Sequence, residues 1–353
     1  MSPRFAPNTT EEMRRRASEP GRGRDAKFPA NIPWKGWKDI LARIISSFSQ
    51  DRVMLIAAGA TFYLLLALFP AVAVFVSIYG LVSDPTTIAG HIAFINTVLP
   101  PAGAELIQSQ LERLVGETST SLSIGFVGGL LFSFWSANYG IMTLFEAMNV
   151  AYGEMERRSF LKLYGLGFAF TLGAFLVGVL LLVTVGLVPA IMAVFGLSGF
   201  ADLLIGMLRW PIAFAILVGS IALVYRFGPS RTRARWSWVI IGAILTSIVW
   251  LAASMAFSWY LQNIANYNAT YGPLGAVIGF MMWVWVSAVI FILGAEINAE
   301  MEHQTALDTT DYPEKPLGQR GARVADTIGE STAKTPRPHT EKKGFLKRRW
   351  RKT

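Results

Sequence analysis

The sequence contains no cysteine and only three histidines among its 353 residues. Without thiols, the chain cannot form a disulfide, a thiolate nucleophile or a cysteine-ligated zinc or iron–sulfur site. One histidine, His303, forms a Glu-x-x-His pair with Glu300, but a di-iron bundle needs a second such pair. The HExxH, nucleotide-binding GxxxxGKS/T and GxSxG motifs are also missing. We therefore expect no catalytic site, no metal and no cofactor.

Charge is scarce as well, at 16% of residues against about 25% in soluble domains. No charged residue occurs between Arg52 and Asp84 or between Lys162 and Asp202. Nearly uncharged runs of this length predict membrane-spanning helices, so the expected fold is all-α and polytopic. The six predicted transmembrane helices cover about 53–82, 122–146, 162–188, 203–227, 238–261 and 273–297.

The basic residues predict the orientation of these helices. Eleven Lys and Arg residues occur up to Arg52, and twelve occur after His303. The three loops on the opposite side, which follow the first, third and fifth spans, contain one Lys or Arg in total. Basic segments stay on the cytoplasmic side, so both termini are expected in the cytoplasm. The net charge of +9 then reflects topology, and we expect a lipid bilayer rather than nucleic acid as partner.

The regions outside the apolar runs give further expectations. Residues 1–32 and 304–353 are polar and predict disordered tails, the second one basic, on either side of a transmembrane domain over 53–303. Residues 33–50 combine tryptophans with basic residues at helical spacing, which is typical of an interfacial amphipathic helix. The outer loop, 83–121, predicts two short amphipathic helices lying over the external mouth.

Polar residues within the predicted spans are the candidates for a functional path. They should face inward, because an unsatisfied polar group in hydrocarbon is costly. The candidates from the residues themselves are Asn138, Glu146, Asn149, Ser254, Ser258 and Glu296. Two interpretations stay open: these side chains line a translocation path, or they are hydrogen-bonding contacts between helices. Pro70 and Pro211 interrupt their helices and are candidate hinges.

The end of the last span raises a specific question. Glu296 should lie near the cytoplasmic interface, facing protein or a water-filled cavity. Glu300, Glu302 and His303 lie farther along and are expected in water. Glu146 should reach a similar depth, which would place it with Glu296 at the cytoplasmic end of one cavity.

The loop between the fourth and fifth spans carries Arg231, Arg233 and Arg235. On the cytoplasmic side these would attract anionic lipid headgroups, at about 1 kcal/mol for each basic residue near the surface. They are our candidate headgroup contacts, and they favour an amphiphile with an acidic headgroup as substrate. The competing interpretation is that they merely anchor the protein.

Three segments together resemble the YihY/BrkB family of bacterial inner-membrane proteins. They are AAGATFYLLLALFPAVAVFVSIYG at 57–80, FSFWSANYGIMTLFEAMNVAYGEMERRSFLKL at 132–163 and YGPLGAVIGFMMWVWVSAVIFILGAEINAE at 271–300. The resemblance implies six transmembrane helices in the cell inner membrane. It also adds Tyr271 and Asn298 to the candidate path. The family was formerly labelled ribonuclease BN, but this chain lacks the metal-binding constellation that a nuclease needs.

These observations favour a candidate transporter of an envelope-related substrate, with an acidic lipid as the leading class. The alternative is a non-transporting scaffold for envelope assembly or virulence-associated resistance. A membrane-bound enzyme ranks third. The sequence leaves a homo-oligomer open.

Overall fold

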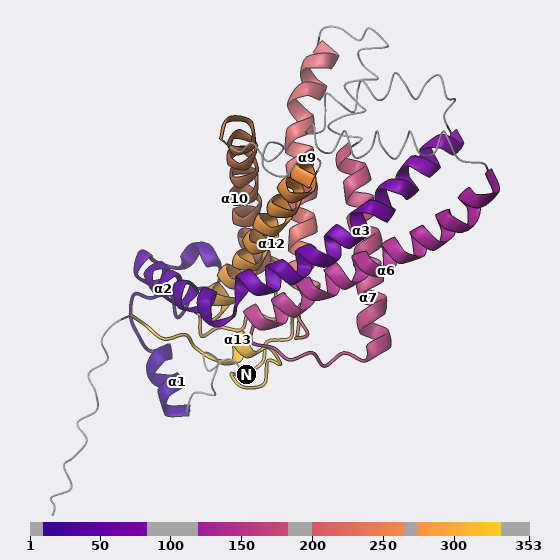
Figure 1. Ribbon diagram of the computed structural model, residues 1–353. Coiled ribbons are helices and arrows are strands. Elements are labelled where there is room, and N and C mark those ends of the chain that lie inside the picture. Colours follow the sequence, from indigo (N-terminus) through magenta and orange to yellow (C-terminus); the bar gives the residue numbers. More distant parts are fainter. Residues whose placement is uncertain (1–9, 83–118, 183–199, 265–273, 333–353) are drawn as a thin grey trace, which may run out of the picture.

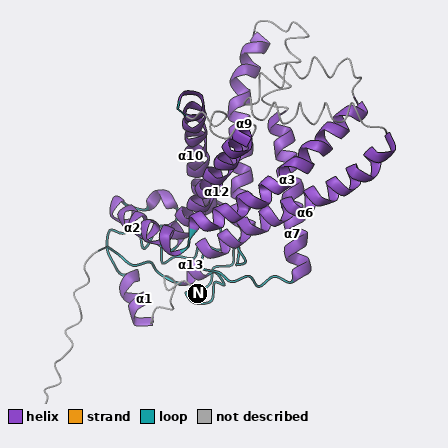
Figure 2. Ribbon diagram, in the orientation of Figure 1, coloured by secondary structure: helices purple, strands orange, loops and turns teal. Residues whose placement is uncertain are grey.

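The computed structural model describes residues 10–82, 119–182, 200–264 and 274–332. This part of the chain is helical (Figure 1). Within it there is no β-strand, and Ala234 and Thr310 form an isolated antiparallel bridge. Figure 2 shows the described loops gathered toward one end of the long helices, near α13. The all-α prediction is confirmed for these residues.

The six apolar runs form six long helices. They are α3 (Val53–Val82), α6 (Ser119–Ala151), α7 (Phe160–Leu182), α9 (Phe200–Phe227), α10 (Trp236–Asn263) and α12 (Gly275–Glu302). At their C-terminal ends α6 and α12 each run five residues beyond the predicted boundary, because neighbouring segments cover those ends and keep them out of water.

Four segments are long and apolar enough to cross a membrane: Phe160–Gly178, Gly206–Phe227, Trp236–Asn263 and Val277–Glu302. A fifth arises if α2 (Trp34–Gln50) and Val53–Ala67 form one span with a 61° bend. Only described residues enter this count. The chain is therefore a polytopic membrane protein with four or five candidate spans, which is a coarser result than the predicted six.

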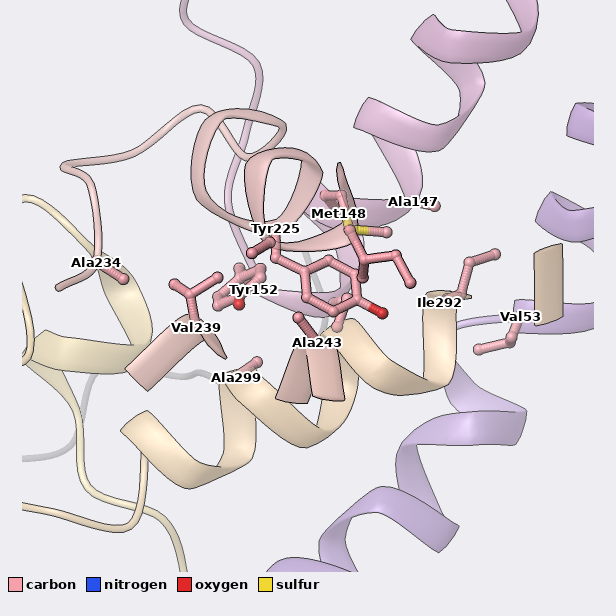
Figure 3. Close-up of a cluster of buried hydrophobic side chains, with 14 of the residues drawn as sticks. Val53, Ala147, Met148, Tyr152, Tyr225, Ala234, Val239, Ala243, Ile292 and Ala299 are labelled. Carbon is pink, nitrogen blue, oxygen red and sulfur yellow. The ribbon is translucent and has the colours of Figure 1, made fainter. Parts of the chain in front are cut away.

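Helix α12 is the central element of the bundle. It contacts α2, α3, α6 and α10, while α10 also packs on α9 and α7 bridges α6 and α9. The core near its C-terminal end is built largely from alanines around two large side chains, Tyr152 and Tyr225 (Figure 3). Small residues let helix backbones approach closely, which suits packing inside a membrane.

Two close approaches depend on glycine. A Cβ at Gly294 of α12 would overlap Thr246 Oγ1 and the Tyr225 hydroxyl, and one at Gly242 of α10 would overlap the amide of Asn298. Tyr225 and Thr246 share a hydrogen bond of 3.0 Å, and the Tyr225 hydroxyl also donates to the carbonyl of Phe291 at 2.7 Å. These glycines therefore fix the distances between α9, α10 and α12.

The two flanking segments differ from the predicted disorder. Residues 10–32 include α1 (Thr10–Ala17) and the 3-10 turn η2 (Pro29–Asn31), and residues 304–332 include α13 (Arg323–Asp326). Both segments gather around the end of α12 (Figure 1). Their polar composition suggested disorder, but Arg16, Arg24 and Arg320 are buried against carbonyl groups and carboxylates. The predicted outer-loop helices and the tail beyond 332 lie outside the described residues.

Candidate functional site

The last two turns of α12 and the residues after it form a buried polar cluster. Its members, all at most 3% exposed, are Glu296, Asn298, Glu300, Glu302, His303 and Gln304. The expectation that Glu300, Glu302 and His303 lie in water was wrong. The reason is physical: the N-terminal and C-terminal segments cover this helix end, so its carboxylates need buried cationic partners.

One such partner is Arg231, from the loop between α9 and α10. Its guanidinium lies 2.6 Å from a carboxylate oxygen of Glu302, and both side chains are 1% exposed. The other Glu302 oxygen accepts a 2.8 Å hydrogen bond from Thr309. The Arg231 guanidinium also lies over the Tyr152 ring at 4.2 Å. The pair therefore joins this loop, α12, the end of α6 and the C-terminal segment.

The electrostatics of this pair follow from burial. Burial alone would lower the pKa of Arg231, but the charge and hydrogen bond of Glu302, together with Tyr152 and Glu154, outweigh it, and the pKa is raised. Burial also raises the pKa of the Tyr152 hydroxyl, and the charges of Glu302 and Glu296 add to this effect. Tyr152 thus stays neutral while Arg231 stays charged.

A second group of contacts comes from the N-terminal side. Arg43 of α2 pairs with Glu300 and donates to the Gln304 side chain at 2.8 Å. Arg24 donates to the carbonyls of Gln304 at 3.1 Å and Gly329 at 2.8 Å. Arg24 and Arg43 therefore connect the end of α12 to the segments on either side of it.

The three arginines predicted to contact lipid headgroups behave differently from one another. Arg231 forms a buried ion pair with Glu302. Arg235 donates to the Thr310 carbonyl at 2.8 Å and lies over the Tyr312 ring at 4.2 Å. Arg233 is exposed, with its guanidinium 4.8 Å from the Phe227 ring. The prediction was therefore wrong for Arg231, because a buried, paired guanidinium cannot reach a headgroup, and Arg235 mainly holds the C-terminal segment.

The predicted polar path does not form one continuous lining. Asn149 is buried. Its side-chain oxygen Oδ1 accepts a hydrogen bond from the backbone N–H of Ser230 at 2.7 Å, and its side-chain Nδ2 donates to Glu156 at 3.0 Å. Glu146 is exposed on α6, whereas Glu296 is fully buried. The prediction that Glu146 and Glu296 share one cavity was therefore wrong.

The remaining polar residues mostly connect neighbouring helices. Asn138 of α6 packs over Gly167 of α7, and Asn298 of α12 packs over Gly242 of α10 while donating to the Val239 carbonyl at 3.4 Å. Ser254 accepts a 3.3 Å hydrogen bond from the Trp283 indole. This pattern favours the interpretation as interhelical contacts.

Other predicted residues contribute less. Ser258 is exposed and accepts a hydrogen bond from Gln262 at 3.2 Å, within its own helix. Pro211 lies inside α9, and position 70 lies within the bounds of α3. Tyr271 lies outside the described residues, as does the side chain of Pro70.

A cavity of about 410 Å³ lies between α3 and α6. Its lining residues are Tyr63, Leu66, Phe132, Trp135, Ser136 and Tyr139. Ser136 donates to the Tyr63 carbonyl at 3.0 Å, and the Tyr139 hydroxyl lies 3.2 Å from that of Tyr164 on α7. Trp135 and Phe132 are exposed, so the cavity opens on the outer surface of the bundle.

Sequence reasoning missed this cavity, although part of its signal was present. Phe132, Trp135 and Tyr139 recur at spacings of three and four, which places three aromatic rings on one face of α6. The wall that completes the cavity, Tyr63 and Leu66, comes from a helix about seventy residues earlier. No sequence pattern pairs these two faces.

The described residues hold no group of three histidine, aspartate or glutamate side chains arranged to bind a metal. His303 Nδ1 lies 3.5 Å from Glu300, and Glu300 is already paired with Arg43. The arrangement of apolar spans around a buried, ion-paired helix end defines a polytopic α-helical membrane protein.

The chain belongs to the virulence factor BrkB family, whose model matches residues 44–318. The resemblance seen in the sequence is thereby confirmed. The family relationship establishes a membrane protein, and it does not by itself establish a substrate or a reaction.

Individual relatives are distant. YfkH of Bacillus subtilis, which is named as a ribonuclease-like protein, is 26% identical over 76% of this chain and 96% of its own length. A UPF0761 membrane protein of Methylibium petroleiphilum is 26% identical over 74% of this chain, which spans only 62% of that relative. A UPF0761 membrane protein of Haemophilus influenzae is 21% identical over 72% of this chain. No solved structure matches the chain.

Proposed function

We propose that this protein is a six-span protein of the bacterial inner membrane, with both termini in the cytoplasm, that moves an amphiphilic envelope component. Helices α3 and α6 have 30 and 33 residues, which is long enough to cross a bilayer. Together with the four spans described above they support the count of six. The distribution of Lys and Arg supports the orientation. An acidic lipid is the leading substrate class.

The observation that carries this proposal is the aromatic cavity between α3 and α6. Its volume of about 410 Å³ falls within the range of ordinary ligand pockets. Its mouth lies among exposed apolar side chains such as Trp135 and Leu66, which face hydrocarbon if α3 and α6 cross the membrane. Its occupant would then enter sideways from the bilayer, and only an amphiphile is present there in quantity.

The polar edge of the cavity suits a headgroup or an ester group. Tyr139 and Tyr164 pair through their hydroxyl groups, and such a pair uses one of the two protons. The second hydroxyl proton remains available to donate to an oxygen acceptor. The buried pair of Arg231 and Glu302 lies at the C-terminal end of α12, away from the residues that line this cavity.

The test uses the full-length protein in liposomes with a fluorescent acidic phospholipid. Wild-type protein should bind the lipid or move it between leaflets. Leu66→Trp should fill the cavity and abolish the effect, whereas Leu131→Trp, at a 66%-exposed position on α6, should leave it unchanged. No binding or movement by wild-type protein would overturn the proposed function, and equal loss in both variants would overturn the role of the cavity.

A second candidate function, a non-transporting scaffold, is favoured by one observation. Asn138, Asn298 and Ser254 are engaged between helices, so a rigid bundle accounts for them without a path. A scaffold would show normal membrane insertion with no lipid movement by wild-type protein in the same assay.

A further inference from the structure

Helix α2 has two faces of opposite character. Its inner face, which includes Ile40, Ile44 and Ser47, is buried, and α2 contacts α12. On its outer face Trp34 is 67%, Leu41 46% and Ile45 75% exposed. A stripe of large apolar side chains spaced at i, i+7 and i+11 would be costly in water along a helix that is otherwise well packed.

The packing of α2 prevents rotation of this stripe into the protein. Arg43 pairs with Glu300 of α12 and donates to the Glu330 carbonyl at 2.8 Å. On the same helix Asp39 accepts hydrogen bonds from the Thr332 backbone at 2.8 Å and hydroxyl at 2.6 Å. Asp39 and Arg43 lie one turn apart on the same side of the helix, so these contacts turn the apolar stripe away from the protein.

The stripe continues into the beginning of α3. The axes of α2 and the first part of α3 differ by 61°, and the turn falls at Arg52, whose φ is +51°. Immediately after the turn Met54 and Leu55 are 51% and 65% exposed. Exposed apolar side chains are therefore present on both sides of the turn at Arg52.

The charge on this face has one sign. Lys35 and Lys38 are exposed, and the Lys38 ammonium lies 5.9 Å from the centre of the Trp34 ring. The single acidic residue of α2 is Asp39, whose side chain is fully buried and paired with Arg22. Apolar residues between exposed lysines, without a competing carboxylate, complement a layer of anionic headgroups above hydrocarbon.

We propose that the outer face of α2 docks into the cytoplasmic surface of the bilayer, with Lys35 and Lys38 contacting acidic lipid headgroups. This assigns the headgroup contact to α2 instead of the loop that holds Arg231. It rests on the orientation in the proposed function but not on transport, because a scaffold would need the same anchor.

The depth test exploits the natural absence of cysteine. A nitroxide is attached to Ile45→Cys or to Ser46→Cys, two exposed neighbours about 100° apart on the helix, in full-length protein in liposomes. The Ile45 label should be accessible to oxygen and shielded from a water-soluble nickel complex, and the Ser46 label should show the reverse. Equal access of the nickel complex to both labels would overturn the proposal. Strong spin–spin broadening at Ile45, which indicates a second copy on this face, would also overturn it.

The headgroup test compares liposomes of phosphatidylcholine alone with liposomes that also contain phosphatidylglycerol. Shielding of the Ile45 label should increase with the acidic lipid, by about fivefold per lysine in the ratio of docked to undocked helix. The double variant Lys35→Gln/Lys38→Gln should lose this increase, and Arg233→Gln, an exposed arginine of the loop between α9 and α10, should retain it. Wild-type behaviour in the lysine variant, or loss in the Arg233 variant alone, would contradict the assignment.

Discussion

Arg231 and Glu302 lie 71 residues apart in the chain and form an ion pair of 2.6 Å in which both side chains are 1% exposed. The pair connects the loop between α9 and α10 to the last turn of α12. Through Thr309, which donates to the second Glu302 oxygen, it also holds the C-terminal segment. A single buried pair thus fixes three parts of this end of the bundle.

The first prediction concerns this pair. Arg231→Met or Glu302→Leu alone should destabilise the protein by about 3–5 kcal/mol, because each leaves one buried charge without its partner. The double variant should be closer to wild type than either single variant. Thermal unfolding in one detergent, measured for all three variants, tests this non-additivity, and simple addition of the two losses would contradict it.

An exposed pair provides the control. Arg235 and Glu314 lie 3.1 Å apart, and the Glu314 side chain is 66% exposed. Glu314→Gln should change stability by less than about 1 kcal/mol, because solvent screens the pair.

A second prediction concerns the close packing of α12. Gly294→Ala should destabilise by about 1–3 kcal/mol, because the added methyl group would overlap Thr246 and Tyr225. Gly219→Ala on α9 meets nothing within 4 Å and should be neutral or slightly stabilising. The test compares the unfolding temperatures of the two variants in the same detergent. Similar values for both would contradict the close packing of α12 against its neighbours at Gly294.

A third prediction concerns pH. Burial by itself would raise the pKa of Glu156, but hydrogen bonds from Arg158 and Asn149 outweigh it and lower the pKa to about 2. A lowered pKa means that ionised Glu156 stabilises the fold above its unfolded pKa, near 4.5, and that this contribution is lost as pH falls toward 2. Glu156→Gln should therefore cost on the order of 1 kcal/mol at pH 7, because the site is partly exposed.

The measurement is the difference in unfolding temperature between wild type and Glu156→Gln across pH. The difference should be constant above about pH 5 and shrink at lower pH. A difference that grows as the pH falls would have the wrong sign for a stabilising carboxylate.

A fourth prediction concerns topology. With both termini in the cytoplasm, Ser109→Cys in the first outer loop should react with a membrane-impermeant maleimide added to intact cells. Arg233→Cys, at an exposed position between α9 and α10, should react only after the membrane is opened. The reverse pattern of labelling would invert the orientation.

The helices were predictable from the sequence because apolar runs act locally. The uncharged stretch after Arg52 became α3 over Val53–Val82, and the tryptophan-bearing segment at 33–50 became α2. Each of these predictions needed only the composition and spacing of consecutive residues. The end of α12 could not be predicted in this way, because the partners that bury it, Arg43 and Arg231, are distant in sequence and lie in segments that look like solvated charge.

The candidate site shows the same limit. Asn149, a candidate for the polar path, is buried, but its partners Ser230 and Glu156 were not predicted. A polar side chain in an apolar helix is expected to face inward, but its actual burial and its partner depend on how the helices meet, as the exposed Glu146 on the same helix shows. The same applies to the cavity. The spacing of aromatic residues places Trp135 on one face of α6, but no sequence pattern pairs that face with Tyr63 of α3.

The contact between the two flanking segments has a consequence for biosynthesis. Arg16 donates to the carbonyl of Ile328 at 2.8 Å, across 312 residues of chain. At about 5–20 residues per second, the ribosome needs roughly 15–60 s to make the intervening residues. During that time every helix of the bundle is produced while the arginines near the N-terminus wait for their carbonyl acceptors. This end of the bundle therefore closes only after residue 328 has been made, and a chain that stops earlier leaves Arg16 without this carbonyl acceptor.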